Sequence, residues 1–390
     1  MFFIGIDAAK DKHDCSVLSS EDGTLDNFTF TNSREGFTNF LEQIQKLCGN
    51  SKTKVGLEST GHYSANLLSF LNAQGFEVVV FNPLSVSRQR AAASLRRTKT
   101  DKNDSRYIAQ MLMAANSLPY QKQSYHISAL KSLTRARFRL VKEIQPLKNR
   151  YRRLIHIVFP ELQGFFCKID LPAVLNLLQV FPTAKDIANA NIVTLTNILS
   201  KASHGRFKRD RAEKLKALAK TSIGIHNIGD AIELKLTAQR IQFMDTQKDQ
   251  FDNEIKSVML DLNSPITSVP GIGFTLGAII LAELGDRNFA TPAKMLAFAG
   301  CEPSTYQSGN YTAARTPMVK HGSRYLRNAL FLAAKAARLH SPSFAAYISR
   351  KKSQGKHEYV ALCHAIKKLV RIIFAVLNSN TKYTEPKPCA

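Results

Sequence analysis

The sequence predicts a mixed α/β domain at the N-terminus, followed by regions that are almost entirely helical. Short β-rich segments alternate with helical spacings over residues 1–118, and strand signals nearly vanish beyond Pro119. The length of 390 residues suits two or three domains, each long enough to bury a core. A hydrophobic fraction of 44% with 22% charged residues is that of a globular protein, which excludes wholesale disorder.

Five strands are expected in the first domain, because five short runs are apolar or rich in β-forming residues and an Asp22-Gly23 turn joins two of them. These runs are residues 2–6, 15–18, 27–31, 54–57 and 76–81. Helical spacing is seen at 37–47 and 63–71, and a further helix is expected after the last strand. The order of these elements indicates a mixed α/β domain over residues 1–118.

The middle region, residues 119–263, is expected to be a basic helical linker. Residues 131–153 carry nine Lys/Arg against one acid, Glu143, and Pro146 is expected to kink or divide this helix. Residues 171–227 read as shorter helices around a basic patch at 203–209. In 232–262, apolar residues recur in steps of three and four, which forms a heptad-like seam at positions 234, 238, 241, 244, 251, 255, 258 and 262. A helix that packs on its own domain and an intermolecular coiled coil fit this seam equally well, and we expect it to form part of an oligomer interface.

A last domain is expected at residues 264–377, helical and rich in small residues, followed by a disordered tail at 378–390. Within it, the segment Ser268-Val269-Pro270-Gly271-Ile272-Gly273 precedes a helical run from Phe274. Gly271 and Gly273 would let backbone amides approach a phosphate, as in a helix-hairpin-helix motif, although a plain interhelical turn has comparable weight.

The charge of the chain points to a polyanionic partner. Lys and Arg number 54 and Asp and Glu 30, giving a net charge of +24, so nucleic acid is the first candidate, and a membrane surface is a weaker one. No apolar run reaches the length of a spanning helix, and the start of the chain lacks the basic segment of a secretion signal. Six scattered cysteines without a C-x-x-C pair indicate a reducing compartment. We therefore expect a cytoplasmic, nucleoid-associated protein rather than a secreted, membrane-spanning or zinc-finger one.

Four acids of the first domain form a candidate metal site. Asp7 and Glu58 end two strands, and Asp101 and Asp104 are three residues apart at the start of a helix, so one face carries both. Convergent carboxylates repel one another unless a cation neutralises them, and hard oxygen ligands suit Mg²⁺ (or Mn²⁺). Each acid alone fits a helix cap or a solvated loop better. The basic residues around the aspartate pair favour chemistry on a polyanion: they include Arg96, Arg97, Lys99, Lys102 and Arg106.

Further cations are candidates for phosphate contacts with DNA or RNA. They are Arg135, Arg139, Arg150 and Arg153 in the linker, and Arg315, Lys320 and Arg324 in the last domain. The last three flank a polar loop with Ser308-Gly309. No nearby residue supplies a base for Ser308, so the loop by itself also fits a solvated serine.

The chain closely resembles the DEDD-type insertion-sequence transposases, a family that includes the Piv-type DNA invertases and the bridge-RNA-guided recombinases. The N-terminal residues that carry the resemblance are Ile4-Gly5-Ile6-Asp7-Ala8-Ala9-Lys10, Leu57-Glu58-Ser59-Thr60-Gly61-His62-Tyr63, Asn82-Pro83 and Lys99-Thr100-Asp101-Lys102-Asn103-Asp104-Ser105-Arg106. The C-terminal ones are Val269-Pro270-Gly271-Ile272-Gly273, Phe298-Ala299-Gly300, Tyr306-Gln307-Ser308-Gly309 and His321-Gly322-Ser323-Arg324-Tyr325-Leu326-Arg327.

The resemblance implies a RuvC/RNase H-like α/β domain, a helical linker with a coiled coil, and a mostly α C-terminal transposase domain. It also implies that a tetrad of Asp7, Glu58, Asp101 and Asp104 binds the divalent metal and that Ser308 is the nucleophile. In family members guided by a structured RNA, base pairing chooses the donor and target DNA. Assistance to Ser308 would require a composite site in which the C-terminal domain folds over the tetrad.

The leading hypothesis is therefore a transposase/recombinase that cuts and rejoins DNA as a homo-oligomer, a dimer or tetramer. A structure-selective nuclease of the Holliday-junction resolvase type would need the tetrad but not Ser308. A non-catalytic nucleic-acid-binding protein would need only the charge of +24.

Overall fold

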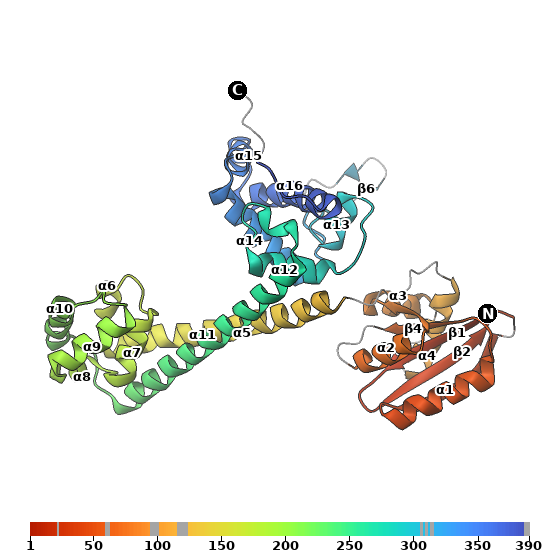
Figure 1. The fold of residues 1–390 in the computed structure, drawn as a ribbon, viewed down its shortest axis with the longest axis horizontal. Coiled ribbons are helices and arrows are strands. Elements are labelled where there is room, and N and C mark those ends of the chain that lie inside the picture. The colour runs from red at the N-terminus through yellow and green to blue at the C-terminus, as the bar shows by residue number, and fades with distance from the viewer. Residues whose placement is uncertain are drawn as a thin grey trace. The chain divides into compact units, whose positions relative to one another are not determined.

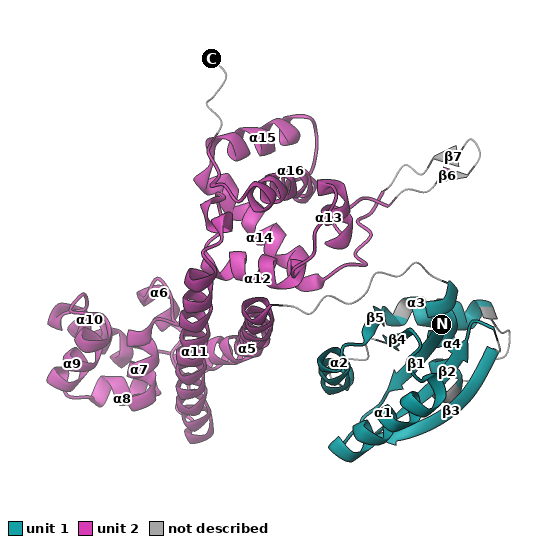
Figure 2. Ribbon diagram, turned by 45° about the vertical axis from the view of Figure 1, so that its right-hand side comes forward, with its two compact units in different colours: residues 1–122 teal, residues 123–390 magenta. Residues whose placement is uncertain are grey.

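The computed structural model describes residues 1–21, 23–58, 63–93, 101–114, 124–304, 307–308, 311–312 and 316–385. Within these ranges the side chains of Leu84, Ala93, Asp101, Lys102, Ser308, Tyr311 and Thr312 are not described. The chain divides into two compact units, unit 1 at Met1–Lys122 and unit 2 at Gln123–Ala390 (Figure 2).

Unit 1 is a mixed α/β domain built on one five-stranded sheet. Its strands are β1 (Phe2–Ala8), β2 (Lys12–Ser19), β3 (Gly23–Thr31), β4 (Thr53–Glu58) and β5 (Glu77–Phe81). Its helices are α1 (Arg34–Cys48), α2 (Ser64–Ala73), α3 (Pro83–Ala93) and α4 (Asp101–Ala114). All five predicted strands and both helices with bounds are confirmed, to within a few residues at each end.

The strand order of the sheet is β3-β2-β1-β4-β5 (Figure 2). The first three strands pair antiparallel, as their short connections allow, and β4 and β5 continue parallel to β1 after helical crossovers. Alternate residues of β1 face opposite sides: Ile4 and Ile6 are buried with α1 and α2, and Phe3 is buried with α3 and α4. Helices therefore cover both faces.

The described elements of unit 2 are helices, apart from the two-residue strands β6 (Gln307–Ser308) and β7 (Tyr311–Thr312). Its first part contains α5 (Tyr125–Val158), α6 (Leu162–Phe165), α7 (Pro172–Val180), α8 (Ala184–Asn189), α9 (Ile192–Ala202), α10 (Arg209–Lys220) and α11 (Ile228–Leu262). Its last part contains the 3₁₀ helix η1 (Pro265–Ser268), α12 (Phe274–Leu284), α13 (Pro292–Phe298), α14 (Arg324–His340), α15 (Pro342–Ser353) and α16 (Glu358–Ser379).

The long helices α5 and α11 pack against each other and connect two separate cores of unit 2 (Figure 1). α5 continues through Pro146, so Pro146 does not divide this helix, and the expected kink stays a prediction. The predicted seam of α11 lies inside its own chain: residues 234, 238, 241 and 244 are buried with α5 and α7 in one core, and residue 255 is buried in the other. Residues 251, 258 and 262 of the seam are partly buried against these two cores. The seam is thus a helix packing on its own unit, and the expectation that it lies between subunits is wrong.

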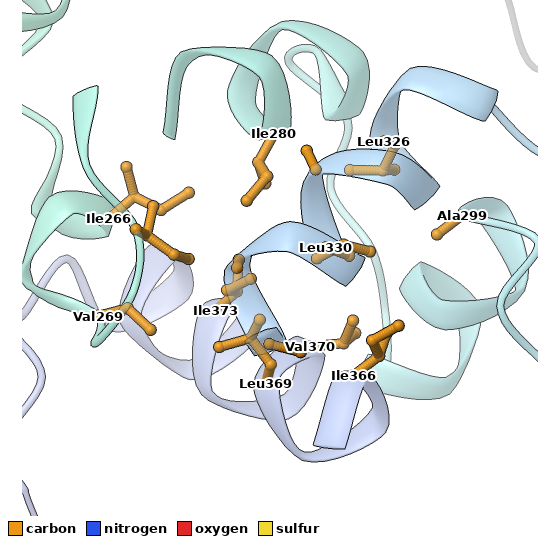
Figure 3. Close-up of a cluster of buried hydrophobic side chains, with 14 of the residues drawn as sticks. Ile266, Val269, Ile280, Ala299, Leu326, Leu330, Ile366, Leu369, Val370 and Ile373 are labelled. Atoms are coloured by element: carbon orange, nitrogen blue, oxygen red, sulfur yellow. The ribbon is translucent and has the colours of Figure 1, made fainter. Parts of the chain in front are cut away.

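The core of the last part joins α12, α14 and α16 around η1. Figure 3 shows Ile280, Leu330 and Ile373 pointing toward one another from the three helices, with Ile266 beside them. The tail up to residue 385 also packs here, unlike the disordered tail expected from the sequence, and residues 386–390 lie outside the described part of the chain. The Tyr383 amide donates to Ser268 Oγ at 2.8 Å, and Glu385 accepts from the hydroxyls of Ser341 and Ser343, each at 2.6 Å. Among the described residues, no helix is both long and apolar enough to cross a membrane.

Candidate active site

Two of the predicted acids lie next to each other at one end of the sheet. β1 and β4 are parallel and in register, with Ile6 opposite Leu57, so Asp7 and Glu58 are the next residues along their strands. Asp7 lies two residues after Gly5, and Glu58 lies two residues after Gly56. Residues two apart on a strand share a face. Both acids therefore belong to the face that α4 covers.

The two glycines let α4 lie directly on this face. A Cβ atom on Gly5 would lie 2.1 Å from the carbonyl oxygen of Ser105 and 2.4 Å from the amide nitrogen of Ala109. A Cβ atom on Gly56 would lie 2.7 Å from the side chain of Leu112. The close approach brings the first turn of α4, where Asp101 and Asp104 lie, to the strand ends that carry Asp7 and Glu58. The backbone thus brings the four predicted acids to one region.

Hydrogen bonds hold the start of α4 in this position. The hydroxyls of Ser16 on β2 and Ser105 on α4 are 2.8 Å apart and buried, and Ser16 also donates to Asn27 Oδ1 at 2.6 Å. Buried hydroxyls need such partners, because an unsatisfied polar group in a core is costly. These bonds fix the helix across β2 and β3 as well as β1.

Asp104 is buried and paired with a cation from α3. Its side chain is 4% exposed, and Arg90 Nη1 donates to both of its carboxylate oxygens at 2.8 Å. A carboxylate buried at this level needs a positive partner to remain ionised. Arg90 is one of the basic residues that surround the aspartate pair in the sequence. Its charge and its position there were the features by which it could have been identified.

A further acid, Asp14, belongs to the same face and was not among the predicted residues. Asp14 on β2 is the direct antiparallel partner of Asp7 on β1. Cross-strand partners face the same side, and like charges in such positions destabilise a sheet unless a cation lies near them. The register of the β1–β2 hairpin could have identified Asp14, since the short turn at residues 9–11 and the alternation of β2 define which residues oppose β1.

The donor chemistry of this region fits a hard divalent cation. Asp7, Glu58 and Asp104 offer carboxylate oxygens, which Mg²⁺ and Mn²⁺ prefer. Among the described side chains, which do not include that of Asp101, no three acids, histidines or cysteines come close enough together to form a complete metal site. Arg90 holds both oxygens of Asp104, so a metal ligand role for Asp104 would require it to share or exchange this partner.

Several predicted residues lie outside the described part of the chain. These are Arg96, Arg97, Lys99 and Arg315, and for Asp101, Lys102 and Ser308 only the backbone is described, at the start of α4 and in β6. Arg106 is described and is exposed on α4.

Many of the basic residues of α5 are paired with acids of the same unit. Glu283 on α12, with a side chain 4% exposed, accepts from Arg135 Nε at 2.8 Å and Nη2 at 3.1 Å. Arg150 and Arg153 lie 3.6 and 3.7 Å from Glu233 on α11. Arg137 and Lys148 bind Asp252 and Asp170. Arg139, in contrast, is exposed and has no acid partner among the described residues.

Glu283 is held as an anion although it is buried. Burial raises the pKa of its carboxyl. The hydrogen bonds from Arg135 and Ser323 and the charges of Arg135 and Lys131 lower it by more, so the net pKa lies below the ordinary value. Ser323 Oγ donates to Glu283 at 2.7 Å and also caps α14 by accepting from the amide of Leu326. The pair therefore ties the start of α14, which carries Arg324, to α5.

The two glycines of the predicted phosphate-binding turn differ in their surroundings. Gly271 has φ of 80°, and a Cβ there would lie 2.4 Å from the amide nitrogen of Ala337, so packing against α14 accounts for this glycine. Gly273 begins α12 as its N-cap, and a Cβ there would meet nothing within 4 Å. Lys320 and Arg324, before and at the start of α14, are at the surface.

Comparisons with known proteins decide the family. A family model described as a transposase of the DEDD IS110 type matches residues 4–160. A second, described as transposase of the IS116/IS110/IS902 family, matches residues 263–349, and together they cover more than half of the chain. The chain belongs to the IS110-type transposases.

Relatives of this transposase match over nearly their whole lengths. A mini-circle protein for IS117 of Streptomyces coelicolor is 26% identical over 100% of this chain and 96% of its own. The insertion element IS116 uncharacterized 44.8 kDa protein of Streptomyces clavuligerus is 24% identical over 99% and 97%. The pilin gene-inverting protein of Moraxella bovis is 24% identical over 98% and 97%. The structure of Thermus thermophilus RuvC is 13% identical and covers 31% of the transposase and all of its own chain, with a TM-score of 0.24.

Proposed function

We propose that this chain is a DNA transposase/recombinase that cleaves and rejoins DNA strands to mobilise an insertion sequence. Its acidic tetrad binds Mg²⁺ (or Mn²⁺), and Ser308 is the nucleophile. The observation that carries the metal site is the parallel register of β1 and β4, which makes Asp7 and Glu58 neighbours on the face that α4 covers. The strand order β3-β2-β1-β4-β5 and its mixture of antiparallel and parallel pairs support an RNase H-like fold for unit 1.

Each part of the site has a distinct task. The tetrad would hold a divalent ion, which when bound would supply positive charge to a phosphodiester and activate its oxygens. Arg90 pairs with Asp104 and so compensates part of the negative charge of the tetrad, which is costly to bury without a positive partner. Arg315, Lys320 and Arg324 hold neighbouring phosphates through charge-assisted hydrogen bonds.

Ser308 makes the reaction reversible without a second energy source. Its hydroxyl gives up its proton as the oxygen attacks phosphorus, a new O–P bond forms, and the bond from phosphorus to a deoxyribose oxygen breaks, with that oxygen taking up a proton. The resulting protein–DNA ester keeps the energy of the phosphodiester, so religation needs no ATP. Water as nucleophile would instead leave a free DNA end.

Replacing Asp7 tests the metal site. Asp7→Ala should abolish strand cleavage, leave DNA binding largely intact, and remove the rise in melting temperature that Mg²⁺ produces in the unaltered chain. Asp11→Ala, which removes an exposed acid four residues away, is the matched control and should change none of the three. Cleavage at a normal rate by Asp7→Ala would remove the metal-site assignment.

Replacing Ser308 tests the nucleophile. Ser308→Ala should still bind DNA but form no covalent protein–DNA adduct on a denaturing gel, whereas Ser304→Ala in the same segment should form it normally. Recombination by Ser308→Ala at the normal rate would show that the assignment is wrong and would favour a resolvase-type nuclease.

We also propose that DNA sites are chosen with a structured guide RNA and that the chain works as a homo-oligomer on DNA. The family resemblance supports both, and the large positive charge suits an RNA partner. A discrete RNA transcribed from the flank of the element should co-purify with the chain. Recombination by protein stripped of RNA would contradict the guide role, and a monomer on DNA by light scattering would contradict the oligomer.

A further inference from the structure

Helix α16 has two faces of different chemistry. One face, with Ile366, Leu369, Val370 and Ile373, is buried in the core of the last part of unit 2, and Figure 3 shows these side chains directed at that core. The other face carries cations in a row at spacings of three and four, which places them on one side of a helix. These cations are Lys367, Lys368 and Arg371, and the row continues to the polar side chain of His364 one turn earlier.

Helix α15 extends the row around an aromatic ring. Lys368 of α16 lies 5.4 Å from the centre of the Tyr347 ring on α15, and Arg350 lies 5.5 Å from the same centre. Lys351 lies 5.9 Å from it. Six cations thus form one surface, the α15–α16 basic face: Arg350, Lys351, Lys356, Lys367, Lys368 and Arg371.

No acid balances these charges. Within the described residues, none of the six forms an ion pair, and the single acid of the two helices, Glu358, is bound by Arg338 and Lys352. The basic stretch of α5 differs, since five of its nine cations pair with acids. The excess of positive charge also affects His364. Burial lowers its pKa, and the charges of Lys351, Lys356 and Lys367 lower it further. Six unpaired cations at one surface repel one another unless a polyanion binds there.

We propose that the α15–α16 basic face binds the backbone phosphates of duplex DNA without reading its sequence. The choice of DNA as the polyanion rests on the proposed function. The charge pattern itself is independent of that function. The row from His364 to Arg371 spans about 10 Å along the helix, at 1.5 Å per residue, which matches about three base-pair steps of 3.4 Å. Lysine and arginine on flexible stems suit phosphate contacts, which position a protein on DNA but carry no sequence information.

The test compares the salt dependence of DNA binding in two matched triple variants of the full chain. One carries Lys351→Gln, Lys356→Gln and Lys367→Gln; the control carries Lys46→Gln, Lys52→Gln and Lys185→Gln, which removes the same charge from exposed positions elsewhere. Binding of a 30-base-pair DNA of arbitrary sequence is measured by fluorescence anisotropy between about 50 and 200 mM NaCl. Each phosphate contact contributes about 0.9 to the slope of log K against log salt concentration.

The first variant should flatten this slope by about 2 to 3, and the control by less than 1. Equal slopes in the two variants, with both folded by circular dichroism, would overturn the proposal. A flattened slope only on a duplex RNA of the same sequence would assign the surface to RNA and overturn it too. Binding is measured in the Asp7→Ala background without cleavage, so this result is independent of whether the proposed recombinase chemistry is correct.

Discussion

At the scale of single residues, the candidate site depends on positions that carry no functional group. Gly5 and Gly56 are the residues that allow α4 to lie on β1 and β4, because any side chain there would occupy the space of Ser105, Ala109 or Leu112. The sequence identified the acids by type and spacing, and it placed them at strand ends correctly. It could not show the glycines as the reason for their convergence, since which helix lies above a glycine is a tertiary fact.

Gly5→Ala should separate the helix from the sheet. A Cβ 2.1 Å from a carbonyl oxygen forces α4 to move, and overpacking of this kind costs about 1 to 3 kcal/mol. Chemical denaturation should show a loss in that range, and DNA cleavage should fall because Asp104 moves with α4. Gly164→Ala on α6, where a Cβ meets nothing within 4 Å, should leave stability and cleavage unchanged. Full stability in Gly5→Ala would contradict the close approach.

A buried histidine makes the stability of unit 1 depend on pH. His13 on β2 is fully buried, with its ring centre 5.1 Å from that of Phe30. Burial lowers its pKa below the ordinary value of 6.5, although Asn32 and Asp14 act in the opposite direction. The unfolded chain therefore takes up a proton first as the pH falls. The stability that His13 confers is complete above pH 6.5 and decreases below it, by at most about 1.4 kcal/mol per pH unit.

Hydrogen exchange of the β2 amides between pH 7.5 and 5 measures this dependence. His13→Leu should remove the loss of stability below pH 6.5. His340→Leu, at an exposed position on α14, should leave that loss in place. An unchanged loss of stability at low pH in His13→Leu would show that other groups cause it.

At the scale of elements, α5 shows how a basic helix differs from a nucleic-acid-binding helix. The sequence gives its nine cations and one acid correctly, but the acids that pair with them come from distant segments, Asp170, Glu233, Asp252 and Glu283. Their approach could not be predicted from spacing, since it depends on α11 and α12 packing against α5. The α15–α16 basic face was missed because its short basic runs belong to two helices and form one surface only when these helices pack.

Arg135 and Arg139, one helical turn apart on α5, should therefore fail in different ways. Arg135→Ala removes the ion-pair partner of the buried Glu283 and leaves it with Ser323 and the charge of Lys131, so we expect a loss of about 3 kcal/mol in unfolding free energy. Arg139→Ala should change that free energy by less than about 0.5 kcal/mol but weaken DNA binding in proportion to a lost phosphate contact. Denaturation and salt-dependent binding of both variants check this pair of outcomes. Equal stabilities would show that Glu283 is held by other partners.

At the scale of the whole molecule, the sequence predicted which region is α/β and which is helical better than the faces along which helices meet. The alternation of strand and helix signals placed the α/β region, and the loss of strand signals placed the helical remainder. The seam of α11 was found as a periodic pattern, but a pattern specifies which side of a helix is buried and not which helix covers it. α5 and α7 of the same unit cover it here.

The fragment Met1–Lys122 should fold by itself. It contains two cores of its own, one on each face of its sheet, and the compact unit ends at Lys122. Circular dichroism should show a cooperative thermal transition with mixed helix and strand content. A fragment without such a transition would show that unit 1 needs unit 2 to fold.

The pair of long helices also sets a length. α5 and α11 have 34 and 35 residues, so each extends about 50 Å at 1.5 Å per residue, and each contributes side chains to both cores of unit 2. The pair is thus a rigid spacer between the α6–α10 helices and the C-terminal helices, about as long as 15 base pairs of duplex DNA. Inserting one heptad into both helices would keep their apolar faces aligned and lengthen the spacer by about 10 Å, or three base pairs. If both ends of the spacer contact one nucleic acid, the separation of their contact points should increase by the same amount.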